Sequence, residues 1–535
     1  MTNQVLSDKG AAVKFKAPVL ILFLFLISIL LRTQSFDNSI RGGHVWLTAH
    51  TVMTLQIWLD EGITKHNYSP IYTYDNDADR HIMSLTSGIS DAEGNYYYVS
   101  YGPFSFLFAF CILKLFGVYP SIFSLQVMNL FIHLFTSWMI YAVICQFYRR
   151  KVLGPVWGPA LIGSVIYLFS MHPLWCHTYV YFADTLMQLM WTGGIYMALG
   201  LFLHKKIDDN RYVAGFGLLI FISIYTEWLA LFFAGVIFCI AALMAFRNRS
   251  YLKLMGAIVV GSIAALSLFV FQFSTINDLP TFIEASFAKY FQRSGYDDNS
   301  LYMTQLNWQF IFKFYTRLYY PIIGMILFLL LASFASKKEA TAKSRKREMI
   351  ILLSMLIIPI ALHHTVFLGF TRMHDFALLK SSVLGAIVIA ILYNRTTHHA
   401  IPAQKKFFHA LSLSIIAIML ALSLFSFYDF DNFQDNKIYE RVSKVVAKTS
   451  SSDEALFILS EADRGNGIMV FMDDHRAISP QVQSMTKRNI LGIEYRAQAF
   501  EHLQNHGLSK GRIFTVSKKG HVINIEAITL SEAGS

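Results

Sequence analysis

The stretch APVLILFLFLISILL, residues 17–31, decides the class of this protein. It contains no charged residue, and with its flanks it approaches the ~20 apolar residues that a helix needs to cross the hydrocarbon core of a bilayer. Residues Phe407–Phe427 form a second such stretch, and similar segments recur along most of the chain. The sequence therefore predicts a polytopic α-helical membrane protein.

The composition supports the same class. Of the 535 residues, 55% are hydrophobic and only 15% are charged, which lies outside the averages of soluble globular domains. The net charge of +11 could suit a nucleic-acid partner, but the basic residues occur in short clusters between apolar segments, where they set topology. Membrane lipids are therefore expected as partners, and nucleic acid is not.

Charge predicts the topology. Basic clusters at 149–151, 205–211, 247–253, 337–347 and 395–406 belong in the cytoplasm with the N-terminus. If Pro103–Val118 crossed the membrane, the cluster at 149–151 would lie on the outside. This segment is short, is rich in Phe and carries Lys114, so we expect it to lie along the membrane surface as an interfacial helix. About eleven transmembrane helices result, near 17–33, 121–147, 156–175, 185–203, 211–225, 228–246, 254–274, 319–336, 348–362, 376–393 and 407–427.

The chain divides into two predicted domains. Residues 1–427 form the transmembrane domain, in which 34–120 is the first exterior loop with interfacial helices, 275–318 is a further exterior loop and 363–375 is an exterior turn. Residues 428–535 form a small C-terminal α/β soluble domain. Its apolar runs at 455–460, 467–472, 512–517 and 522–528 predict strands, and 438–448 and 496–506 predict helices.

Polar side chains gather at the predicted exterior ends of the helices, and such residues tend to mark function in membrane proteins. Asp37, just after the first span, is the leading candidate for a catalytic base, although it could instead cap the next helix. His44 follows Arg41 by three residues on that helix, so both could face one pocket. Asp184 opens a span, and helix capping is the alternative to a functional role there. Glu227 lies at a tight turn between two spans, and anchoring at the membrane interface is its alternative.

Cations occur in the connection before residue 380. Arg372, with Lys380 one to two turns deeper, could hold a pyrophosphate, and simple snorkelling of both side chains is the alternative. The neighbouring histidines, including His364 and His374, show no zinc spacing. The run Asp75–Asp79 lacks the glycine and the closing glutamate of a calcium loop, so no metal ligand is predicted. A divalent cation is the only cofactor left open.

The layout resembles the GT-C superfamily of membrane glycosyltransferases, which includes protein O-mannosyltransferases and aminoarabinose transferases. Phe36-Asp37-Asn38, His44–Gly62 and Tyr98–Gly117 are similar to the long first exterior loop of that family, and Asp184 is similar to its second acid. The paired acidic motif usual in that loop is not present as Asp-Glu, and Gly102-Pro103 stands where Pro-Pro often occurs.

The resemblance implies transfer of a sugar from a polyprenyl-phosphate-linked donor to a glycan, lipid or protein acceptor. The bacterial inner membrane is the implied location, with a cytoplasmic N-terminus and a periplasmic C-terminal domain. The catalytic residues would be Asp37, His44 and Asp184, and the substrate-binding residues Arg41, Tyr101, Glu227, His364, Arg372, His374 and Lys380. A polysaccharide polymerase or ligase, and a lipid-linked glycan transporter or flippase, are the alternatives.

Overall fold

The computed structural model describes most of the chain. The described residues are 17–36, 45–82, 88–149, 157–295, 301–335, 342–399, 402–433, 438–460, 471–472, 477–478, 480–493, 495–519 and 522–531. They fold into two compact units. Unit 1 comprises residues 1–36, 126–267 and 290–432, and unit 2 comprises 37–125, 268–289 and 433–535. The predicted domain boundary at residue 427 stays a prediction.

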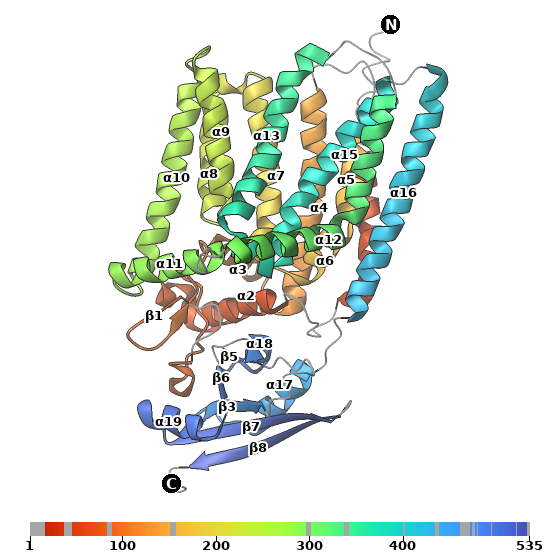
Figure 1. Cartoon of the computed structure of the whole chain (residues 1–535). Helices are drawn as coiled ribbons and strands as arrows, with labels where there is room; N and C mark the ends of the chain where they lie inside the picture. Colours follow the sequence, from red (N-terminus) through yellow and green to blue (C-terminus); the bar gives the residue numbers. More distant parts are fainter. Residues whose placement is uncertain are drawn as a thin grey trace. The chain divides into compact units, whose positions relative to one another are not determined.

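Unit 1 is built from long apolar helices that run side by side in Figure 1. Among the described residues seven helices are long and apolar enough to cross a membrane, or eight if one bent pair counts as a single span. Ala17–Leu30, α8 (Asn210–Ile224) and α9 (Leu229–Ala245) are shorter apolar helices at predicted spans. The predicted fold class, a polytopic membrane protein with a C-terminal α/β domain, is confirmed.

The long helices share one length scale. Each has at least 20 residues and thus rises ~30 Å or more, which matches the hydrocarbon core. They are α4 (Ile122–Tyr148), α7 (Ala183–Leu203), α10 (Tyr251–Ser274), α12 (Leu301–Ala335), α13 (Ala342–Val366), α15 (Lys380–His399) and α16 (Pro402–Phe433).

Helix α15 lies in the core of unit 1 and packs against α5 (Trp157–Phe169) and α12. In its most apolar window 89% of the residues are buried, compared with 22% in α16. Helix Ala17–Leu30 packs Ile21 and Phe25 against Leu130 of α4. The sequence cannot separate α15 from α16, because both are apolar and only packing decides which one is enclosed.

Two connections differ from the sequence prediction. The predicted span 156–175 is broken at Ser170 into α5 and α6 (Met171–Tyr179), which are bent by 55°. Pro173 explains the break, because its ring has no N–H and clashes with the carbonyl of residue 169 in a continuous helix. The prediction of a loop over 275–318 is wrong for the described residues, which form α11 (Leu279–Ser294) and the first half of α12.

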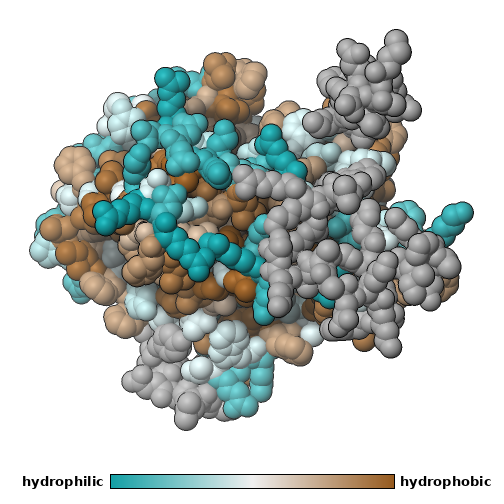
Figure 2. Space-filling view, turned by 90° about the horizontal axis from the view of Figure 1, so that it is seen from above, coloured by the Kyte–Doolittle hydropathy of each residue, from teal (hydrophilic) through white to brown (hydrophobic). Residues whose placement is uncertain are grey.

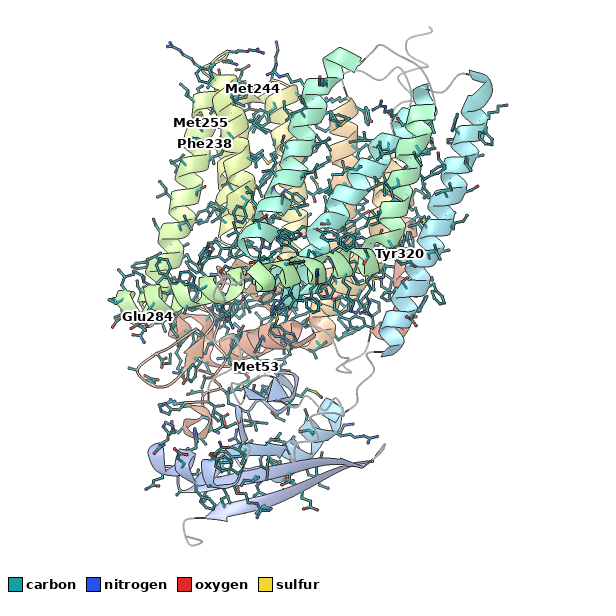
Figure 3. The ribbon with its side chains drawn as sticks, viewed as in Figure 1. Met53, Phe238, Met244, Met255, Glu284 and Tyr320 are labelled. Atoms are coloured by element: carbon teal, nitrogen blue, oxygen red, sulfur yellow. The ribbon has the colours of Figure 1, made fainter. Side chains whose placement is uncertain are left out.

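Helix α12 contains Pro321, which removes one backbone hydrogen bond and favours a kink. In Figure 1 its first part runs across the other helices and its second part runs along them. Figure 3 labels Tyr320, the residue before the proline, near this change of direction. Tyr315, in the first part of α12, contacts His364 in the last turns of α13 and Ser381 at the start of α15.

The basic turns gather at one end of the helices in unit 1. Figure 3 labels Met244 at the end of α9 and Met255 near the start of α10, at the top of the view. Exposed Lys205, Lys206 and Arg247 belong to the turns at this end. Figure 2 looks down on it and shows hydrophilic side chains beside hydrophobic ones. The start of α7 therefore lies ~30 Å away, at the opposite end.

Unit 2 combines the first loop with the C-terminal domain. The loop contains α2 (Val45–Ile57), the hairpin β1 (Ile89–Ser90) and β2 (Tyr96–Tyr97), and α3 (Phe104–Leu115). Helix α3 has 12 residues and rises ~18 Å, which is too short to cross a bilayer. Its place along the membrane surface stays a prediction.

The C-terminal sheet has the strand order β4-β5-β6-β3-β7-β8. Central β3 pairs in parallel with β6 and β7, and β7 pairs antiparallel with β8. The strands are β3 (Ala455–Ser460), β4 (Phe471–Met472), β5 (Ala477–Ile478), β6 (Ile490–Ile493), β7 (Lys510–Lys519) and β8 (Val522–Ser531). The helices are α17 (Ile438–Thr449), α18 (Pro480–Thr486) and α19 (Ala497–Asn505). Phe457, Ile513 and Ala499 form part of the core.

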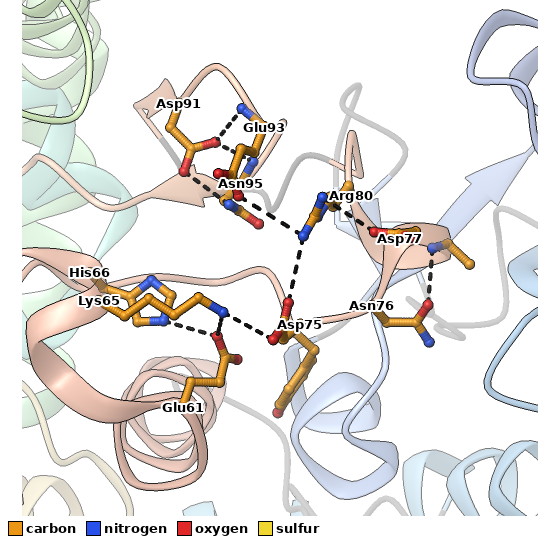
Figure 4. Close-up of polar contacts among 12 residues, drawn as sticks. Glu61, Lys65, His66, Asp75, Asn76, Asp77, Arg80, Asp91, Glu93 and Asn95 are labelled. Carbon is orange, nitrogen blue, oxygen red and sulfur yellow. Dashed lines mark hydrogen bonds and ion pairs between the residues drawn. The ribbon is translucent and has the colours of Figure 1, made fainter.

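Charged side chains of the first loop form ion pairs that Figure 4 shows. Lys65 Nζ lies 3.0 Å from Glu61 and 2.9 Å from Asp75, and Arg80 contacts Asp75 and Asp77. Asp79 accepts two hydrogen bonds of 3.0 Å from Arg488 Nε. The carboxylates of the run 75–79 are therefore satisfied by cationic side chains.

Candidate functional site

Four helix ends of unit 1 bring ionisable side chains together. Asp184 is the second residue of α7, Glu227 lies in the turn between α8 and α9, His363 is in the last turn of α13, and Lys380 begins α15. All four side chains are at most 1% exposed. We call these residues the buried network.

Direct contacts connect the buried network. Lys380 Nζ donates to Asp184 Oδ1 at 2.7 Å and lies 3.4 Å from Glu227 Oε1. His363 Nε2 lies 3.0 Å from the same Glu227 oxygen. The ammonium of Lys380 thus contacts both carboxylates, and the imidazole of His363 contacts the carboxylate of Glu227 as well.

The local helices explain why carboxylates occupy these positions. The N-terminus of a helix carries a partial positive charge that favours a carboxylate. Asp184 lies in the first turn of α7, and Glu227 Oε2 accepts a hydrogen bond of 3.0 Å from the backbone N–H of Leu229, at the start of α9. Glu227 therefore caps the start of α9, a role that the sequence suggested for Asp184 and not for Glu227, and this capping coexists with the ion pair.

One oxygen of the buried network has no partner. Asp184 Oδ2 is buried and forms no hydrogen bond within the described parts of the chain, and the same holds for His363 Nδ1. Buried polar atoms in native proteins are nearly always hydrogen-bonded, so an unpaired carboxylate oxygen indicates a place where substrate or water binds. With a neutral imidazole the buried network carries a net charge of −1.

A layer of tyrosines adjoins the buried network. Tyr315 OH lies 2.9 Å from His364 Nε2 and 2.6 Å from Ser381 Oγ, one residue after Lys380. Tyr319 OH lies 2.7 Å from His172 Nδ1, and it also contacts the carbonyl of Leu378 and the hydroxyl of Ser382. Sequence reasoning missed both tyrosines, because Tyr315 fell in the predicted loop 275–318 and Tyr319 was only the first residue of the predicted span 319–336. Their i, i+4 spacing was the available signal.

The remaining predicted site residues are more scattered. Arg372 is half-buried and, where the structure describes the chain, forms no ion pair; its Nη2 lies 3.6 Å from Met373 Sδ. The His374 ring stacks on Phe376 with centroids 5.1 Å apart. Tyr101 is buried in unit 2 beside Tyr98. Asp37, Arg41 and His44 lie outside the described residues.

The buried network does not fit a metal ion. No group of three His, Cys, Asp or Glu side chains that could hold one occurs among the residues with described positions. Lys380 already places its positive charge between the two carboxylates, where a cation would meet repulsion. The chemistry available here is therefore that of carboxylates, an ammonium and imidazoles.

No protein-family model and no curated protein sequence matches this chain. Solved structures do match over nearly its full length. ArnT from Cupriavidus metallidurans, bound to undecaprenyl phosphate, aligns with a TM-score of 0.58 and 10% identity, covering 93% of each chain. This chain has the fold of the GT-C glycosyltransferases.

An archaeal protein also aligns with this chain in structure. AglB from Archaeoglobus fulgidus, in complex with an inhibitory peptide and a dolichol-phosphate, aligns with a TM-score of 0.53 and 11% identity. The alignment covers 94% of this chain and 69% of AglB. The same oligosaccharyltransferase with Zn and sulfate aligns at 0.55 and 11% identity, covering 92% and 67%. The predicted resemblance to GT-C proteins is confirmed for the fold.

Proposed function

We propose that this protein is a membrane glycosyltransferase that moves a sugar from a polyprenyl-phosphate-linked donor to a glycan, lipid or protein acceptor. The buried network at the helix ends of a GT-C fold is the observation that carries the proposal. Structural neighbours with undecaprenyl phosphate and with dolichol-phosphate support the donor class. A bacterial inner membrane, with the site and the C-terminal domain on the periplasmic side, fits the basic turns at the opposite helix ends.

The reaction would be a direct displacement. An acceptor hydroxyl or amine attacks the anomeric carbon, the bond from that carbon to the phosphate oxygen breaks, and polyprenyl phosphate leaves with the bonding electrons. A carboxylate removes the acceptor proton. We assign this role to Asp37, as the resemblance implies, with His44 or Asp184 positioning the acceptor. The unpaired oxygen of Asp184 supports its part in this group.

Lys380 suits a role different from the one that the sequence suggests. Its charge is already matched by Asp184 and Glu227, so it fixes these carboxylates better than it could stabilise a leaving phosphate. Arg372 has no such competitor among the described side chains, and its planar guanidinium suits phosphoryl oxygens. We therefore assign phosphate binding to Arg372, with Arg41 and His374 as further candidates, and the positioning of Asp184 to Lys380.

A transfer assay tests the proposal. Purified protein in lipid is given radiolabelled sugars on polyprenyl phosphate, and wild type is compared with Asp37→Asn and Asp184→Asn. We expect transfer by wild type, its loss in Asp37→Asn, and a loss of at least tenfold in Asp184→Asn. The matched control Asp278→Asn, at an exposed position, should keep full activity. A chelator in a parallel reaction tests whether transfer requires a divalent cation.

The two other candidates give different results in the same preparation. A polymerase or ligase transfers whole glycans from lipid-linked oligosaccharides and leaves monosaccharide donors unused. A flippase moves labelled lipid-linked glycan across vesicle membranes without forming product. Full activity of Asp37→Asn would overturn the assignment of the base, and movement without transfer would overturn the enzyme class.

A further inference from the structure

A second polar cluster is buried in unit 1, where the first apolar helix ends. Arg32 follows helix Ala17–Leu30 and is 0% exposed. Its Nε donates to the Ser28 carbonyl at 2.9 Å and its Nη2 to the Ser28 hydroxyl at 3.0 Å. Its Nη1 has no partner within the described chain. A guanidinium keeps its charge at physiological pH, and its burial costs free energy unless an anion or further hydrogen bonds compensate it.

Helix α4 supplies the facing side of the cluster. Gln126, Asn129 and His133 follow one another at spacings of three and four residues, so they share one face of the helix. Each is at most 1% exposed. Gln126 Nε2 reaches the carbonyl of Ser35 at 3.4 Å, three residues after Arg32. This face therefore lies against the segment that carries the guanidinium.

Two histidines and a tyrosine continue the cluster. The rings of His133 and His177 stack with centroids 4.6 Å apart, and Arg32 lies within electrostatic range of both. His133 Nε2 donates to the carbonyl of Tyr167 at 3.3 Å, so the Nδ1 of its neutral ring is an acceptor. His177 Nε2 shares a hydrogen bond of 2.9 Å with the Tyr167 hydroxyl.

The cluster leaves an unusual set of buried atoms without a hydrogen bond among the described residues. They are Arg32 Nη1, Gln126 Oε1, Asn129 Nδ2 and Oδ1, His133 Nδ1 and His177 Nδ1. Native proteins leave few buried polar atoms unsatisfied, so six on three neighbouring segments indicate an occupant. The set contains a fixed cation together with both donors and acceptors. It would match a ligand that carries an oxyanion beside hydroxyl groups.

We propose that Arg32, Asn129 and His133 bind the sugar-phosphate headgroup of the substrate. The phosphate would contact Arg32 and the Asn129 amide N–H, and sugar hydroxyls would donate to His133 Nδ1 and Gln126 Oε1. The buried atoms by themselves point to an oxyanion beside hydroxyl groups. That the hydroxyl groups belong to a sugar rests on the proposed glycosyl transfer. This site competes with the assignment of the donor phosphate to Arg372 on α14 (Leu368–Met373), and the Arg32→Gln variant decides between the two residues.

Binding by the full-length protein in lipid nanodiscs tests this headgroup site. The probes are undecaprenyl phosphate and glucose 1-phosphate, with glucose as the uncharged control, and the readout is the rise of the thermal unfolding midpoint with probe concentration. We expect both phosphates to stabilise wild type. Arg32→Gln should weaken binding at least tenfold and Asn129→Leu at least threefold. Arg247→Gln, which changes an exposed arginine, should match wild type.

The outcomes separate this inference from the proposed function. Stabilisation by undecaprenyl phosphate alone would mean that the lipid chain contributes, and stabilisation by glucose 1-phosphate would mean that the headgroup suffices. Asp184→Asn should bind the probes and lose transfer. Arg32-dependent binding by a wild type that transfers no sugar would leave the headgroup site intact and reject the proposed reaction. Equal binding by Arg32→Gln and Arg247→Gln, or none by wild type, would reject the headgroup site. If Arg32→Gln does not fold, Asn129→Leu decides alone.

Discussion

Lys380 Nζ and Asp184 Oδ1 are 2.7 Å apart, although 196 positions separate the two residues in the chain. Both side chains are fully enclosed, and the ammonium also reaches Glu227. A single cation therefore decides whether two buried carboxylates are compensated. This dependence makes Lys380 the residue of the buried network that is most sensitive to substitution.

Replacing Lys380 by Met should lower the thermal unfolding midpoint strongly. Removing one partner of a buried ion pair costs about 3–5 kcal/mol, because it leaves an uncompensated charge in the interior. Lys253→Met, at an exposed position in the first turn of α10, should change stability by no more than about 0.5 kcal/mol. Adding Asp184→Asn to Lys380→Met should recover part of the loss. Equal unfolding midpoints for Lys380→Met and Lys253→Met would show that the ion pair between Lys380 and Asp184 does not form.

The hydroxyl of Tyr319 should matter more than that of its neighbour Tyr320. Tyr319→Phe removes contacts to His172, Leu378 and Ser382 and leaves buried groups unsatisfied, at a cost of about 1–3 kcal/mol. Tyr320→Phe removes one exposed hydrogen bond to Ser426 and should be nearly neutral. Thermal unfolding in detergent measures both. A loss of stability only in Tyr320→Phe would contradict the packing of α12.

The C-terminal domain should lose stability in mild acid. Burial, with His506 and His81 nearby, lowers the pKa of His502 to about 4. The unfolded chain, with an ordinary pKa of 6.5, takes up a proton as the pH falls from 6.5 towards 4, while the folded domain does not. The free energy of unfolding should therefore fall in this window, by on the order of 1–2 kcal/mol after solvent screening is allowed for.

Hydrogen exchange of the β7 amides, corrected for intrinsic rates, measures this acid dependence. His502→Gln should flatten it, and His409→Gln, at an exposed position on α16, should leave it unchanged. Protection that is constant between pH 6.5 and 4 in the wild type would contradict the burial of His502.

Asn489 should hold the first loop in an ordered conformation within unit 2. Its side chain accepts a hydrogen bond from the Tyr74 amide at 2.9 Å and donates to the Tyr72 carbonyl at 2.8 Å. Asn489→Leu leaves both backbone groups unsatisfied, at about 1–3 kcal/mol each. We expect faster hydrogen exchange in residues 71–75, whereas Asn505→Leu, at an exposed helix end, serves as the control. Unchanged exchange would show that other contacts order this segment.

Local sequence patterns predicted much of the fold. The strand prediction 455–460 coincides with β3, and the helix prediction 438–448 coincides with α17 to within one residue. These predictions held because alternation and helical periodicity are properties of neighbouring residues. Helix α18 and strand β6 were not predicted, because they are short and their burial depends on the sheet around them.

The candidate site was predictable only as a set of separate residues. Asp184, Glu227 and Lys380 each drew attention as an ionisable group at a helix end, but nothing in the sequence pairs them. The sequence by itself determined the membrane class and the location of the apolar helices, since hydrophobicity acts over about twenty neighbouring residues. Tertiary structure alone decided that Lys380 compensates two acids and that Tyr315 and Tyr319 adjoin them, because these contacts depend on how distant helices pack and where α12 bends.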